Sequence, residues 1–146
     1  MVHDALGRRK GGGAILSIDR IALVAAAVQH RLALANRDEI LARYDLGAFA
    51  HIIRYDHGDY GDDAQESLAN LMHLDSSAIR RHARVSETLY GSELQAVLQL
   101  RTPEGAMLRW SHLEILAAIR SPSKRRLLAA AAATDSLSVR ALRSRM

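Results

Sequence analysis

Apolar residues recur at seven-residue spacing between positions 18 and 53, and this feature constrains the fold more than any other in the chain. Two interleaved series carry the pattern: Ile21, Val28, Ala35, Ala42 and Phe49 form one, and Ile18, Ala25, Leu32, Leu46 and Ile53 form the other. Such series make a continuous stripe along one side of an α-helix, broken here at Glu39. They predict one long helix capped by Ser17, or two collinear helices separated near Asn36 and Asp38. We expect the stripe to pack against the rest of the domain, with dimerisation as the alternative.

The composition favours helices throughout. Hydrophobic residues make up 49% of the 146 residues, dominated by the strong helix formers Ala and Leu, whereas aromatic residues make up only 4%. Two prolines leave long stretches without a helix breaker. We predict an all-α fold with a single multi-helix domain over residues 17–146. A glycine-rich, flexible basic arm is expected over residues 1–16.

Several function classes are excluded by what the chain lacks. It has no cysteine, so it can form neither disulfides nor thiolate metal sites. No apolar run reaches the roughly 18–20 residues of a membrane span, and the N-terminus lacks the pattern of a secretory signal. We expect a cytoplasmic protein with no membrane partner.

Positive charge is concentrated in the second half of the chain. Residues 1–75 carry eight Arg and Lys against eleven Asp and Glu, a net charge of −3. Residues 76–146 carry twelve against five, a net charge of +7. This asymmetry indicates either a polyanion partner for the second half or simply a basic, solvated surface.

The stretch 63–88 has the pattern of a helix-turn-helix. Leu68, Ala69 and Met72 are expected on the inner face of a first short helix, and residues 73–75 form the turn. Leu74 is placed to fill the core between the helices, and Asp75 can cap a second helix from about residue 76 to 88. That second helix would turn Ile79 and Ala83 inward, with His82 packed rather than available for DNA.

The outward face of the second helix carries hydroxyl and guanidinium groups. These side chains can read base edges or hold the phosphate backbone of double-stranded DNA. The predicted set on this helix is Ser76, Ser77, Arg80, Arg81 and Arg84.

Cap signals divide the C-terminal part into further helices. Ser92 opens one to about residue 100, Ser111 and Glu114 form a capping box, Ser121 and Pro122 start another helix, and Ser138 caps the last. Basic residues of these last two helices are predicted to hold the DNA backbone: Lys124, Arg125, Arg126, Arg140 and Arg143.

Catalytic and metal sites are disfavoured by spacing. His51, His57 and Asp59 lie in an acidic, glycine-containing stretch that fits neither a calcium loop nor a His-Glu-x-x-His helix. The neighbouring Ser111 and His112 cannot converge as nucleophile and base, and no orienting acid accompanies them. We therefore expect no enzyme, no cofactor and no metal.

Three segments together resemble a known family. Residues 68–85, with Ala69, Ile79, His82 and Arg84, resemble the helix-turn-helix of ParB-type partition proteins, KorB included. Residues 110–119 and 137–142 resemble later motifs of the same proteins. Tyr44, Gly47 and the pair at 60–61, with residues 110–112, look closer still to the N-terminal DNA-binding domain of YhcG-type nucleases.

The departures from that family bear on function. The arginine-rich nucleotide-binding motif of ParB proteins is missing, so we expect no CTP switch, and no Asp…Glu-x-Lys nuclease cluster occurs. The resemblance implies a nucleoid-associated protein that binds double-stranded DNA, either alone or as a homodimer. The alternative is an interaction or dimerisation adaptor for a nuclease or DNA-segregation partner.

Overall fold

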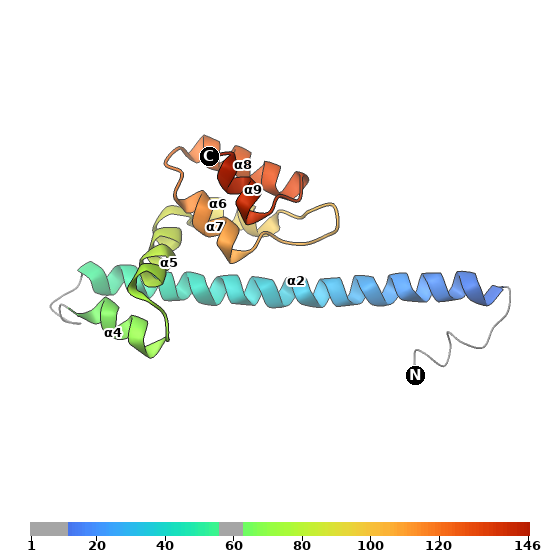
Figure 1. Cartoon of the computed structure of the whole chain (residues 1–146), viewed down its shortest axis with the longest axis horizontal. Coiled ribbons are helices and arrows are strands. Elements are labelled where there is room, and N and C mark those ends of the chain that lie inside the picture. Colours follow the sequence, from blue (N-terminus) through green and yellow to red (C-terminus); the bar gives the residue numbers. More distant parts are fainter. Residues whose placement is uncertain (1–11, 56–62) are drawn as a thin grey trace. The chain divides into compact units, whose positions relative to one another are not determined.

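The computed structural model describes residues 12–55 and 63–146, and in these ranges every regular element is a helix (Figure 1). The predicted all-α class is confirmed. The elements are α2 (Gly12–Tyr55), α4 (Ala64–Leu71), α5 (Ser76–Thr88), α6 (Gly91–Gln99), α7 (Trp110–Ala117), α8 (Pro122–Thr134) and α9 (Val139–Ser144). None of the helices in the described ranges is long and apolar enough to cross a membrane.

The long helix predicted around residues 18–53 is a single helix, α2, without a break at Asn36 or Asp38. It begins at Gly12, so Ser17 is not its cap and residues 12–16 are not an irregular arm; the rest of the predicted arm, residues 1–11, lies outside the described residues. Each glycine costs a helix only about 1 kcal/mol, which the following Ala- and Leu-rich turns offset.

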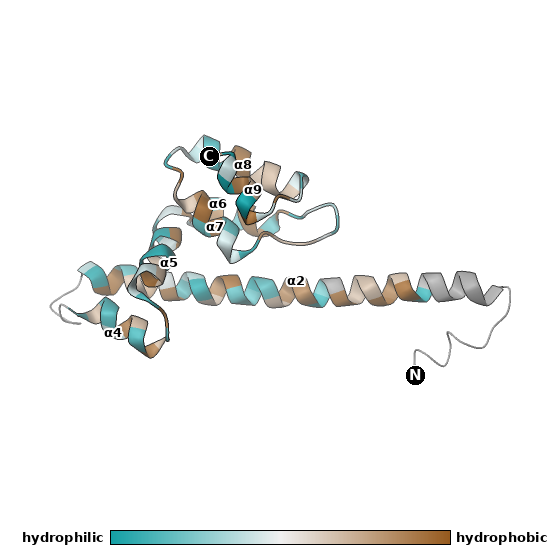
Figure 2. Cartoon of the chain, in the orientation of Figure 1, coloured by the Kyte–Doolittle hydropathy of each residue, from teal (hydrophilic) through white to brown (hydrophobic). Residues whose placement is uncertain are grey.

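The chain divides into two units, residues 1–34 and 35–146, and each is described by itself. In the first unit, the large apolar side chains of α2 that the structure describes are exposed. Figure 2 colours this stretch of α2 by hydropathy, and several of its residues are brown. The exposed side chains are Ile21, Leu23, Val24, Val28, Leu32 and Leu34. The predicted burial of the stripe is therefore wrong for this stretch.

In the second unit, one of the two predicted series on α2 is packed into the core and the other is not. Ile53 is buried and Leu46 is half-buried, as predicted, whereas Ala35, Ala42 and Phe49 of the other series are exposed. The buried face also contains Ile40, Gly47 and Ala50, which belong to neither series. Gly47 determines which face of α2 is turned toward α5, because a Cβ atom at this position would lie only 2.1 Å from the backbone oxygen of His82. Only a glycine allows α2 and α5 to approach this closely.

Two sets of buried residues hold the second unit together. Ala50, Ala69, Ile79 and Ala83 form a cluster where α2, α4 and α5 meet, and Leu46, Leu68 and Leu74 pack against it. Met72, predicted on the same inner face, is 47% exposed because α4 ends at Leu71. Helix α7 contacts α5, α8 and α9, and its Leu113 and Leu116 are fully buried.

Half of the predicted caps are present, and Ser92 is not one of them because α6 already begins at Gly91. Ser121 accepts a hydrogen bond from Lys124 N and Ser138 accepts one from Ala141 N, as expected at the starts of α8 and α9. The box predicted from Ser111 and Glu114 is wrong. Helix α7 already begins at Trp110, and the backbone N–H of Arg109 donates to Nδ1 of His112 at 3.1 Å.

Candidate nucleic-acid interface

Helix α5 is positioned at its start by the turn that precedes it. His73 adopts a left-handed φ of 55°, which reverses the chain after α4, and Leu74 then packs against the apolar cluster. The Asp75 carboxylate accepts from the backbone N–H of Ala78 at 2.6 Å and from the Ser77 hydroxyl at 2.6 Å. These bonds lower the pKa of Asp75, with the Ser77 hydroxyl as the largest contribution. The sequence signals for this turn are thus confirmed.

The inward face of α5 is anchored to α2. Ile79 and Ala83 are buried, as predicted. Beside them the Ser86 hydroxyl donates to the Tyr44 carbonyl at 2.6 Å, and the Tyr44 hydroxyl donates to the Ser86 carbonyl at 3.3 Å. This reciprocal pair fixes the rotation of α5 about its axis, and therefore which residues face outward.

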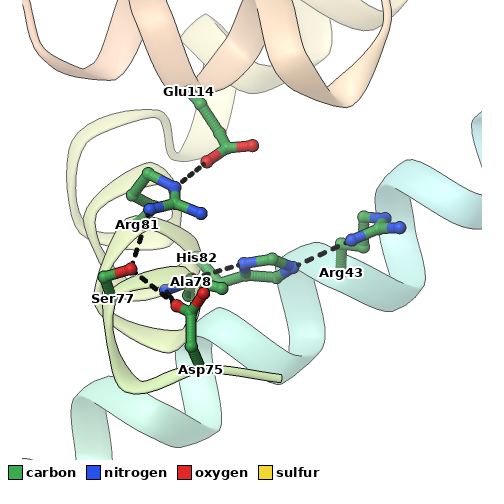
Figure 3. A network of polar contacts seen from close by, with 7 residues as sticks. All are labelled: Arg43, Asp75, Ser77, Ala78, Arg81, His82 and Glu114. Carbon is green, nitrogen blue, oxygen red and sulfur yellow. Dashed lines mark hydrogen bonds and ion pairs between the residues drawn. The ribbon is translucent and has the colours of Figure 1, made fainter. Parts of the chain in front are cut away.

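His82 occupies the centre of the packed face, and its predicted packing role is confirmed. It is 3% exposed and its ring lies 4.9 Å from that of Trp110. Nδ1–H donates to the Ala78 carbonyl at 2.7 Å, which leaves Nε2 to accept from Arg43 Nη1 at 3.2 Å (Figure 3). Burial lowers the pKa of His82; the bond to Ala78 opposes this, and the charge of Arg43 adds to it. His82 is therefore held in its neutral form.

The outward face of α5 carries the predicted arginines. Ser76, Arg80 and Arg84 are exposed, while Ser77 is half-buried through its bond to Asp75. Because Arg80 and Arg84 are four residues apart on one helix, they lie on the same face. Helix α5 thus has an exposed basic face on one side and a buried apolar face on the other.

Arg81 is exposed but already bound within the protein (Figure 3). Its Nε donates to Glu114 of α7 at 2.8 Å, and its Nη1 donates to the Ser77 hydroxyl at 3.1 Å. Sequence reasoning assigned Glu114 to a helix cap and missed this pairing, since the two residues are 33 positions apart.

An open depression of about 570 Å³ lies between α5, α7 and α9. Its polar lining comes from all three helices: Arg81, Arg84, Ser111, Glu114 and Arg143. The basic C-terminal helix α9 therefore shares one concave surface with α5, which the sequence alone did not indicate.

The remaining predicted cations divide into two groups. Lys124, Arg126, Arg140 and Arg143 are exposed, as a contact with DNA requires. The prediction is wrong for Arg125, which is 7% exposed and pairs with Glu93 through Nε at 2.7 Å and Nη2 at 3.1 Å. Its Nη1 donates to the carbonyls of Ile119 and Arg120. Arg125 is a structural residue that ties α8 to α6.

Two of the histidines that were weighed for catalysis or metal binding, His51 and His112, lie in the described ranges. His112 is buried and its Nε2–H donates to the Leu137 carbonyl at 2.8 Å, so it links α7 to the segment before α9. His51 lies 3.8 Å from Glu87, while His57 and Asp59 lie outside the described residues. Across 12–55 and 63–146 no three His, Asp or Glu side chains are grouped to hold a metal ion.

Comparisons of the chain with family models, with curated proteins and with solved structures found no match.

Proposed function

We propose that this protein binds double-stranded DNA, with α5 in the major groove and the basic residues of α8 and α9 along the phosphate backbone. The observation that carries the proposal is the two-sided character of α5. Ile79 and Ala83 are buried against α2 and α4, while Arg80 and Arg84 are exposed on the other side. A helix after a tight turn, with its polar side outward, suits the major groove.

Two further features support this proposal. The concentration of positive charge in residues 76–146 suits a polyanion, and Arg143 of α9 lines the same depression as Arg84 of α5. The resemblance of residues 68–85 to the helix-turn-helix of ParB-type proteins points the same way. Base contacts are assigned to Ser76 and Arg80, and backbone contacts to Arg84, Lys124, Arg126, Arg140 and Arg143.

The test is a salt titration of binding to a labelled 20-base-pair duplex, followed by fluorescence anisotropy. Each neutralised phosphate contributes about −0.9 to the slope of log affinity against log salt. With at least four backbone contacts the slope should be about −4 or steeper. Absent binding at low salt, or a slope near zero, would exclude the proposal.

A second candidate function is favoured by the exposed apolar side chains of α2 between Ile21 and Leu34. Patches of this kind commonly mark interaction sites, so this stretch suits docking to a nuclease or DNA-segregation partner. This function predicts that Leu32→Asp abolishes capture of the partner while DNA affinity is unchanged. Equal capture by the variant and the unchanged protein would exclude it.

A further inference from the structure

We infer that the depression between α5, α7 and α9 is a binding site for a single phosphate group. The inference rests on the proposed function in one respect: DNA is the expected source of that phosphate. The polar part of its lining consists of three arginines from two helices, Arg81, Arg84 and Arg143, together with Ser111 and Glu114 of α7, and the remaining lining residues are apolar. We call this set the phosphate site.

The charge of the phosphate site fits a phosphate. Glu114 balances one guanidinium, that of Arg81, through the 2.8 Å ion pair. In the described part of the chain neither Arg84 nor Arg143 has a carboxylate within ion-pair distance. Two positive charges therefore remain for one phosphate, and Arg-phosphate hydrogen bonds are among the stronger ones in proteins.

Arg81 is held in place before any ligand arrives. Two of its five N–H groups donate to Glu114 and to Ser77, and Ser77 is itself fixed by Asp75, as Figure 3 shows. The other three N–H groups of Arg81 take no part in these two hydrogen bonds. A side chain already ordered loses less conformational entropy on binding, so Glu114 and Ser77 act as positioning residues.

Helix α7 adds a donor and a favourable dipole. Ser111 lies in its first turn, where the backbone carries partial positive charge and a hydroxyl can donate to a phosphate oxygen. The depression is open to solvent and much larger than a phosphate. A phosphodiester can therefore enter while the nucleic-acid chain continues on both sides. One phosphate held by α5 and α9 would fix how α5 is placed on the duplex.

The experiment has two arms, both read from ¹H–¹⁵N spectra that include the arginine Nε–H signals. Inorganic phosphate is titrated first and a 20-base-pair duplex second, at constant ionic strength, with chloride as the reference anion. Arg143→Ala is compared with its control Arg120→Ala, since Arg120 is exposed, does not line the depression and has no assigned contact with DNA. Both side chains are exposed, so both variants should keep the folded spectrum.

We expect saturable shifts at Arg81, Arg84 and Ser111 with inorganic phosphate, with an affinity about tenfold weaker in Arg143→Ala and unchanged in Arg120→Ala. The duplex should shift the same signals. When the duplex titration is repeated at several salt concentrations, the slope of log affinity against log salt should be about 1 shallower in Arg143→Ala. Phosphate binding without duplex binding would support the phosphate site with free phosphate as its ligand, and would reject DNA binding. Duplex binding with no phosphate-induced shift at these residues would overturn the phosphate site and leave DNA binding intact. Absence of both would overturn both.

Discussion

Helices α5 and α8 each have 13 residues and each contain two adjacent arginines, but the arginines have different roles in the two helices. In α8, Arg125 is buried against Glu93 and Arg126 is exposed. In α5, Arg80 is exposed, and Arg81 lies at the edge of the depression, bound to Glu114. The same dipeptide thus provides a structural ion pair in one helix and an exposed basic face in the other. Burial, rather than residue type, separates the two roles.

The largest effect is expected on α8. Arg125→Ala would leave the Glu93 carboxylate partly buried without its partner, which typically costs about 3–5 kcal/mol of the free energy of unfolding. Urea denaturation should show this loss. The neighbouring Arg126→Ala removes the same charge from an exposed position and should change stability by less than about 0.5 kcal/mol. Equal losses in the two variants would show that Arg125 is not the structural member of the pair.

The next effect tests how α5 is held on α2. Gly47→Ala places a methyl group on the backbone oxygen of His82, and such overpacking typically costs about 1–3 kcal/mol. Helix propensity alone predicts the opposite sign, a gain of about 1 kcal/mol. Thermal denaturation of Gly47→Ala and of the control Ala42→Ser, which changes an exposed position on the same helix, decides between these two expectations. A stabilised Gly47→Ala would contradict the close helix crossing.

Interactions between residues close together in the chain could be predicted from the sequence, whereas interactions between distant residues could not. Asp75, Ser121 and Ser138 were recognisable as caps because each bonds a backbone N–H three residues later. The partners of Arg81 and Arg125 lie 33 and 32 positions away, so no local pattern distinguishes a buried arginine from an exposed one. Likewise the buried face of α2 follows from the crossing at Gly47: the predicted series with Leu46 and Ile53 lies on this face, and the series with Ala35 and Ala42 does not.

A smaller, pH-dependent effect is expected at His82, on the buried side of α5. Its pKa is lowered in the folded state, mainly by burial, so the unfolded chain binds a proton first as the pH falls below about 6.5. Stability should therefore decrease from about pH 6.5 down through the folded-state pKa, by at most about 1.4 kcal/mol per pH unit. Arg43, Arg81 and Glu114 are the charged groups that act on the ring. Chemical denaturation from pH 7.5 to 4.5 should show a shallower slope in His82→Asn; an identical slope would contradict the account.

The smallest effect is expected for the ion pair on the exposed side of α5. The Arg81 and Glu114 side chains are 48% and 21% exposed, so solvent screens their attraction. Glu114→Gln should lower the free energy of unfolding by less than about 1 kcal/mol, and 0.5 M salt should reduce the difference further. A loss comparable to that of Arg125→Ala would remove the contrast between the two helices.

The most direct test of the outward role of α5 is duplex affinity as a function of salt for the double variant Arg80→Ala/Arg84→Ala. Arg31→Ala, an exposed arginine of α2, serves as the control. We predict affinity at least about tenfold weaker for the double variant, with unchanged denaturation, and the control close to the unchanged protein. A double variant that binds the duplex as tightly as the control, with the same salt slope, would contradict the assignment of α5 to DNA.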